Sequence, residues 1–272
     1  MIDWRHWHNE PFLIGGLIFC GWLYAILTGP LRARLAPGAA YPVGRAVKFY
    51  SALVIFYLAV GSPFDQIGER FLLCAHMVQH QLLMYPSALL FLLGLPEWVV
   101  RPLTAPRPLR TVLRLVTRPA VCGVAFVVVY SAWHLPGLYN WALQDKVVHV
   151  IQHLMFFGVA LLYWWPLVSP SRELPPISYP GQMIYLVLVE IGMMPVFAFI
   201  TFSHGILYPT YEFAPRIIAN FSPADDQLLA GVIMKLVGMA VGIGAFTVSF
   251  CHWYRASHRP DGSVGPPDGR AW

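Results

Sequence analysis

The sequence predicts an all-α integral membrane protein built as a bundle of seven transmembrane helices. Of its 272 residues, 57% are hydrophobic and only 11% are charged, whereas roughly a quarter of the residues in a soluble domain are charged. Apolar runs of membrane-spanning length recur along the chain, separated by connections rich in Pro, Gly and Arg. The net charge of +5 is then explained by basic loops at a membrane surface, and no nucleic-acid partner is expected.

Crossing the hydrocarbon core takes about 20 apolar residues in a helix. The runs that qualify span residues 11–29, 44–61, 70–94, 119–135, 147–168, 180–204 and 227–251. No positively charged signal region precedes the first run, which is therefore expected to be a permanent helix. We assign residues 1–256 to one seven-helix transmembrane domain. Residues 257–272 are polar and rich in Pro and Gly, which predicts a disordered cytoplasmic tail.

The basic residues predict how the bundle is oriented. Most Lys and Arg residues follow the first, third, fifth and seventh runs, and such residues collect in cytoplasmic loops. We therefore expect the N-terminus outside and the C-terminus in the cytoplasm. Most histidines and many acidic residues then fall at the outer ends of the helices, so any site that they form is expected to open on the extracytoplasmic side.

Two histidine pairs are the strongest chemical signal. His76 and His80 lie in the third run, and His149 and His153 lie in the fifth. On a helix, residues four apart leave the same face about 6 Å apart along the axis, which suits two imidazoles that share one metal ion. We expect the two pairs to face each other and to bind a metal. The alternative is that each ring is satisfied by a backbone carbonyl or an aromatic neighbour.

Further candidates lie around these pairs. His134 and His204 end the fourth and sixth runs and are candidates to join the shell. Met77 is the best candidate for a thioether ligand, which would favour Cu(I), although packing is its alternative role. Asp65 is expected to be a ligand or to hold a histidine tautomer, or to stabilise a helix N-terminus. Cys74 lies two residues before His76 and is a possible second-shell group.

Two charged residues are placed deep in the membrane. Glu190 in the sixth run and Lys235 in the seventh both fall near the midplane, so they are expected to form a buried pair, with a proton path as the alternative. At the N-terminus, His6 and His8 suggest a Cu(II) capture segment, or simply a solvated tail.

Several blocks resemble the CtaG family, seven-helix assembly factors of caa-type cytochrome c oxidase. The similar blocks are SPFD and HMVQHQLL, then WHLPGLYNWAL, then HVIQH, then DDQLLAGVIMK, within residues 45–250. Lys235 stands where the family usually has an aromatic residue. The resemblance implies a multi-pass protein of the bacterial inner (cytoplasmic) membrane that delivers copper to the oxidase, with oxidase subunits and a periplasmic copper donor as partners. By position, it points to His76, Met77, His80, His134, His149 and His153, with Asp65 in the preceding turn.

The favoured hypothesis is a non-catalytic, copper-handling assembly factor. Two alternatives remain open. One is a membrane zinc hydrolase with three histidine ligands, a bound water, Asp65 as base and a lipid-sized cavity. The other is a haem protein with two axial histidines facing across a gap.

Overall fold

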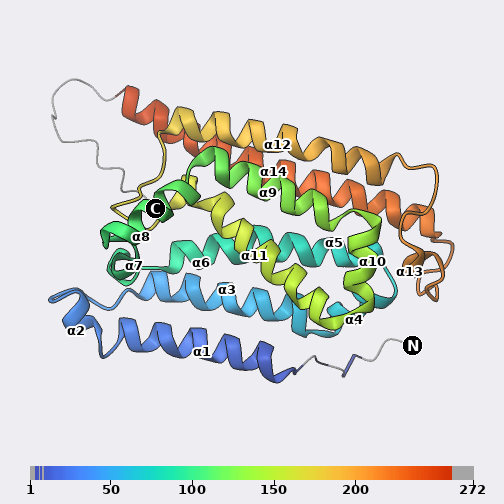
Figure 1. Ribbon diagram of the computed structural model, residues 1–272, viewed down its shortest axis with the longest axis horizontal. Helices are drawn as coiled ribbons and strands as arrows, with labels where there is room; N and C mark the ends of the chain where they lie inside the picture. The colour runs from blue at the N-terminus through green and yellow to red at the C-terminus, as the bar shows by residue number, and fades with distance from the viewer. Residues whose placement is uncertain (1–3, 6, 8, 259–272) are drawn as a thin grey trace.

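The computed structural model describes residues 4, 5, 7 and 9–258. The suggested capture residues His6 and His8 lie outside the described residues, as do residues 259–272 of the expected tail. Within the described residues, every regular element is a helix, as the hydropathy pattern predicts. The longest helices lie side by side along the long axis of the molecule (Figure 1).

Among the described residues, five helices are long and apolar enough to cross a membrane. They are α1 (Pro11–Thr28), α3 (Val43–Gly61), α11 (Lys146–Val168), α12 (Tyr179–Thr201) and α14 (Pro223–Ser257). The third expected run is divided into α5 (Leu73–Leu82), the π-helix η1 (Leu83–Ser87) and α6 (Ala88–Gly94), and the fourth is α9 (Pro119–Trp133). All seven apolar runs are therefore helical.

Two bent helix pairs decide the number of spans. Residues 73–94 meet α7 (Glu97–Thr104) at 90°, and α8 (Arg107–Val116) meets α9 at 58°. The described part of the chain therefore contains five candidate spans, or up to seven if each bent pair forms one.

Short helices gather at the two ends of the bundle (Figure 1). We call the end formed by α4 (Pro63–Arg70), α10 (Pro136–Gln144) and α13 (Pro209–Glu212) the histidine end. At the opposite end lie α2 (Arg32–Leu35), α7 and α8. The hydropathy pattern predicts these segments as connections, because it indicates a spanning helix only where an apolar stretch is long.

The first helix lies at the edge of the bundle and contacts α3. Near its last turn, Tyr24 stacks on Phe49 with ring centroids 4.1 Å apart, and its hydroxyl donates to the Gly94 carbonyl at 3.0 Å. A Cβ on Gly94 would lie 2.6 Å from the Phe49 backbone nitrogen, so this close approach requires glycine. At the histidine end, an ion pair between Lys146 and Glu10 joins the start of α1 to α11.

The start of α5 is fixed by a carboxylate from the distant helix α14. The backbone N–H groups of Leu73 and Cys74 donate to Asp226 at 2.8 and 2.9 Å, and the Asp226 side chain is fully buried. The unpaired N–H groups and the dipole of a helix N-terminus both favour an anion there. This contact sets the position of the turn that carries His76.

The expected pairing of Glu190 with Lys235 is confirmed. Lys235 Nζ donates to Glu190 Oε2 at 2.9 Å, across the interface between α12 and α14. A Cβ on Gly242 would lie 3.3 Å from Glu190 Oε1, so the glycine face of α14 leaves room for the carboxylate.

Candidate metal centre

Five buried histidines meet near the histidine end of the bundle. His76 and His80 come from α5, His134 follows the last turn of α9, and His149 and His153 come from α11. The first three are fully buried and the last two are 6% and 7% exposed. The i, i+4 spacing places each helical pair on one face, and the packing of α5, α9 and α11 brings the faces together.

The expectation that the two pairs face each other is confirmed. The Nε2 atoms of His76 and His80 lie 2.9 Å apart. Between the helices, the ring centroids of His76 and His149 are 5.3 Å apart, and those of His80 and His153 are 5.5 Å apart. The His134 ring lies 5.8 Å from that of His80. The rings thus form one continuous cluster.

Within this cluster, His76, His149 and His153 can hold a metal ion. One ring nitrogen from each lies within 4.8 Å of the other two. Nitrogens that share an ion at 2.0–2.1 Å are separated by about 3.3–4.2 Å, depending on the geometry. Small ring rotations would therefore close the three ligands on one ion.

The hydrogen bonding of the rings fits a metal. His80 Nδ1 and the Nε2 atoms of His134, His149 and His153 are buried, and they have no hydrogen-bond partner within the described part of the chain. Leaving such a group unsatisfied costs about 1–3 kcal/mol. A cation bound among these nitrogens would satisfy several of them at once.

Two partners fix ring tautomers so that lone pairs point into the cluster. His149 Nδ1 lies 2.6 Å from Glu69 Oε1, and His134 Nδ1 lies 2.6 Å from the Tyr130 carbonyl oxygen. Both oxygens accept, so each Nδ1 carries a hydrogen and each Nε2 of the neutral ring keeps its lone pair. A carboxylate behind a histidine is a common second shell of a metal site.

A tyrosine acts in the same way behind His76. The Tyr211 hydroxyl donates to the Gly68 carbonyl at 2.7 Å, so its oxygen accepts from His76 Nδ1, which lies 3.3 Å away. Tyr139 is linked to it at 3.1 Å between the hydroxyl oxygens. Burial raises the pKa of both tyrosines well above the usual value, so the phenols remain protonated donors.

Asp65 lies in the first turn of α4, where the dipole of the helix favours a carboxylate, and Glu69, one turn later, lies behind the ring of His149. Asp65 accepts from Gln79 Nε2 at 2.7 Å, and the same amide donates to the Ala59 carbonyl at 2.8 Å. Asp65 therefore braces α5 at the residue before His80. Its i, i+4 spacing to Glu69 was visible in the sequence, but nothing there showed which carboxylate would reach the ring.

The other predicted site residues lie around the cluster. Met77 is buried in the hydrophobic core, and its side chain leaves α5 about 100° away from that of His76. Cys74 is buried, and its backbone N–H donates a hydrogen bond to Asp226 Oδ1. His204 is exposed in the loop after α12, so the structure does not bring it into the buried cluster. Tyr130 and Tyr211 were not foreseen, because tyrosines near helix ends are also typical of a membrane interface.

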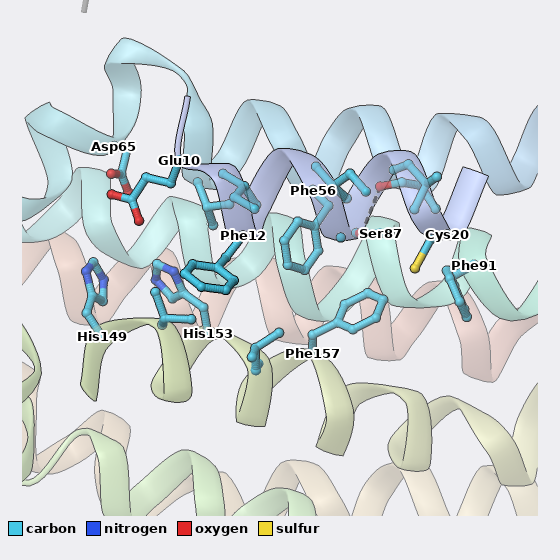
Figure 2. Close-up of a pocket in the computed structure, with 18 of the residues that line it drawn as sticks. Glu10, Phe12, Cys20, Phe56, Asp65, Ser87, Phe91, His149, His153 and Phe157 are labelled. Atoms are coloured by element: carbon cyan, nitrogen blue, oxygen red, sulfur yellow. Dashed lines mark hydrogen bonds between the residues drawn. The ribbon is translucent and has the colours of Figure 1, made fainter. Parts of the chain in front are cut away.

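An apolar cavity of about 370 Å³ reaches the cluster from the side of α1. Figure 2 shows His149, His153, Asp65 and Glu10 at one end, and Phe12, Phe56, Phe157 and Phe91 along its length. The metal candidates His149 and His153 are therefore reached through a largely apolar passage between α1 and α11.

One of three comparisons with known proteins gives a match. The family model described as cytochrome c oxidase caa3 assembly factor (Caa3_CtaG) matches residues 22–256. That range includes every histidine of the cluster, together with Glu69, Tyr211 and Asp226. Searches of curated proteins and of solved structures gave no significant match.

Proposed function

Because the chain belongs to the Caa3_CtaG family of cytochrome c oxidase caa3 assembly factors, we propose that it binds a copper ion in the histidine cluster and passes it to the oxidase. The observation that carries this proposal is the set of buried ring nitrogens without partners around His76, His149 and His153. Family membership implies an interaction with the oxidase and suggests a non-catalytic role.

The proposed primary ligands are His76, His149 and His153. His80 and His134 contact the same cluster and complete or exchange with this shell as the ion moves. Such a surplus of nitrogens supports transfer, because an ion can leave one ligand while another takes its place. Met77 remains a predicted thioether ligand that would require a change of side-chain orientation. Imidazole accepts copper, zinc and iron, so the choice of copper rests on the family's association with the oxidase.

The geometry favours a single ion over haem. A haem needs two axial imidazoles on opposite faces of a porphyrin, but His76 and His80 are joined directly at 2.9 Å between their Nε2 atoms. Other rings pack within 6.0 Å of His76, including those of His149 and His153. The space between the pairs is therefore sized for an ion.

The proposed setting is a bacterial inner (cytoplasmic) membrane with the histidine end facing the periplasm. The basic loops of the sequence support this orientation. A periplasmic copper donor would load the site, and an oxidase subunit would receive the ion. Because Glu69 of α4, Tyr139 of α10 and Tyr211 of α13 contact the histidines of the cluster, these helices are the proposed contact surface for both partners.

Metal analysis of the purified protein tests the proposal. We expect about one copper ion per chain after loading with Cu(I), and loss of that ion in both His76→Ala and His149→Ala. The matched control is His258→Ala, because His258 is exposed at the end of α14. Copper retained by both cluster variants, or lost equally by the control, would contradict the proposal.

One observation favours a second candidate function, a zinc-dependent lipid hydrolase. The apolar cavity brings Asp65 and Glu69 to the same end as His149 and His153, and a hydrolase would need both a base and a lipid-sized passage. The discriminating measurement is release of fatty acid from a neutral lipid ester by zinc-loaded protein. Turnover that disappears in His149→Ala would establish the hydrolase. Protein that binds copper and releases no fatty acid would support the assembly role instead.

A further inference from the structure

We propose that α8 is an interfacial helix whose arginine face binds the phosphate groups of anionic phospholipids. The helix lies at the end of the bundle opposite the histidine end (Figure 1), so this role is separate from the metal centre. The two faces of α8, its angle to α9 and the absence of carboxylates around its arginines support this role.

The residues of α8 divide into an arginine face and an apolar face. At 100° per residue, its three arginines fall within about 60° around the helix axis. Leu109, Val112 and Val116 fall within about 60° on the opposite side. The arginines are Arg107, Arg110 and Arg114. This division is typical of a helix that lies in the plane of a membrane surface, with its apolar face toward the acyl chains.

The rest of the protein leaves the apolar face of α8 uncovered. None of the ten residues of α8 is buried, and Leu109, Val112 and Leu115 are 39%, 58% and 54% exposed. An isolated helix of this length is only marginally stable in water, so the apolar face of α8 needs a covering. The acyl boundary of a bilayer supplies one, whereas a nucleic acid would cover the arginines alone.

The junction with α9 places α8 at the boundary of the membrane. The 15 residues of α9 span about 22 Å, which is less than the hydrocarbon thickness of about 30 Å. The membrane surface therefore lies close to the start of α9, where α8 bends away by 58°. If α8 continued the span, its arginines would enter the hydrocarbon at a high cost. Along the surface, they lie at the level of the lipid phosphates.

The arginines of α8 have no carboxylate to neutralise them. Around the neighbouring helix α7, Arg101 lies 3.9 Å from a carboxylate oxygen of Glu173, and Arg172 lies 4.0 Å from one of Glu97. By contrast, no arginine of α8 forms an ion pair within the described residues. A guanidinium group matches the geometry of a phosphate with two parallel hydrogen bonds. This positive face therefore attracts anionic head groups.

Hydrogen exchange of the full-length protein in nanodiscs tests the proposal. One sample contains dioleoylphosphatidylcholine alone, and the other contains a mixture of this lipid with dioleoylphosphatidylglycerol. We expect the backbone amides of α8 to exchange at least about five-fold more slowly in the anionic nanodiscs, because binding of the arginines holds the helix on the surface. Salt at about 1 M should remove most of this difference, because it screens charges beyond about 3 Å.

Two double variants supply a matched pair. Arg107→Gln with Arg114→Gln removes two charges from α8, and Arg34→Gln with Arg255→Gln removes two from α2 and the end of α14. All four side chains are exposed at the same end of the bundle. The first variant should reduce the lipid-dependent slowing to about two-fold or less, whereas the second should retain it. Arg107→Lys with Arg114→Lys keeps both charges and should retain most of the slowing.

Equal exchange of α8 in the two kinds of nanodisc would overturn the proposal and would favour an acidic protein surface as the partner of these arginines. The same loss of slowing in both glutamine variants would also overturn it, because the effect would then follow the net charge of the protein and not the arginine face of α8.

Discussion

At the residue scale, the centre depends on the groups behind the histidines as much as on the rings. Glu69, Tyr130 and Tyr211 each contact an Nδ1 atom, at 2.6, 2.6 and 3.3 Å. Each contact leaves the matching Nε2 for the interior of the cluster. The rings are thereby oriented in the protein itself, which would lower the cost of ordering them when the proposed ion binds.

Replacement of Glu69 by Gln tests this orientation. The variant keeps the size of the side chain but removes the carboxylate that accepts from His149 Nδ1. Loss of such a partner typically weakens metal binding 10- to 100-fold, and we expect that range for Cu(I) in competition with a chelator. Glu212→Gln, on the exposed side of α13, is the control and should leave the affinity unchanged. Equal affinities of the two variants would rule out this role for Glu69.

The sequence predicted these residues unevenly. His76, His80, His149 and His153 could be found because i, i+4 spacing is a local property of a helix. The residues behind them could not, because Tyr211 and Glu69 reach the rings through contacts between separate segments. For that reason the sequence indicates Asp65 but not Glu69, and it indicates His204 although that residue lies in an exposed loop.

At the scale of elements, the contact between Asp226 and the start of α5 positions the histidine-bearing helix. Asp226 comes from α14 and accepts from Leu73 and Cys74, both backbone groups. The same helix begins with its own capping box, formed by Ser222 and Asp225. Adjacent aspartates therefore serve the ends of two different helices.

Asp226→Asn tests the contact between these helices. The amide presents N–H groups as well as one oxygen, so at least one of the two backbone donors loses its acceptor. We expect a loss of about 1–3 kcal/mol in unfolding free energy and a lower metal affinity, measured by thermal unfolding and metal titration. Asp225→Asn, at the exposed capping box, should affect stability less and leave metal affinity unchanged. The reverse order of effects would refute the assignment.

The pair of Glu190 and Lys235 makes a prediction for the interface between α12 and α14. Removing one partner leaves a charge without its counter-ion, which costs roughly 3–5 kcal/mol when the site is buried. Lys235→Met alone should therefore lower the thermal stability strongly, and Glu190→Leu added to it should restore most of the loss. If the double variant were no more stable than Lys235→Met, the pair would not be coupled.

Hydropathy predicted the long helices well and the short ones poorly. The seven expected runs coincide with helices because membrane-length apolar stretches have few alternatives. By contrast, α4 and α10 are short and partly polar, and their helical form is stabilised by packing at the histidine end. The sequence placed Asp65 near a helix end but did not show that a separate helix carries it.

At the scale of the whole molecule, the candidate metal centre lies at one end of the helical bundle. The histidine cluster contacts Glu69 of α4, Tyr139 of α10 and Tyr211 of α13, and the polar end of the cavity is lined by Asp65 and Glu69 of α4. The arginine-rich helix α8 lies at the opposite end, next to α7. This division supports the proposed orientation, with the basic end in the cytoplasm.

Reporter fusions test that orientation. Green fluorescent protein fused after Ser257 should fluoresce, because it folds in the cytoplasm, whereas alkaline phosphatase fused there should be inactive. A phosphatase fusion within the loop between α12 and α14 should be active on the periplasmic side. The opposite pattern in both fusions would show the reverse orientation, with the histidine end facing the cytoplasm.

The wide helical turn at Leu83–Ser87 lies directly after the histidine-bearing half of its helix. This π-helical turn contains Pro86, and a π-helical turn holds about one residue more than an α-helical turn. Both kinds of turn complete one rotation, so the wider turn absorbs the extra residue and leaves α5 and α6 in the angular relation of an uninterrupted helix. Because α6 packs against α3 and the start of α5 is bonded to Asp226, deleting one residue within Leu83–Ser87 should shorten the helix by about 1.5 Å while His80 still faces His153.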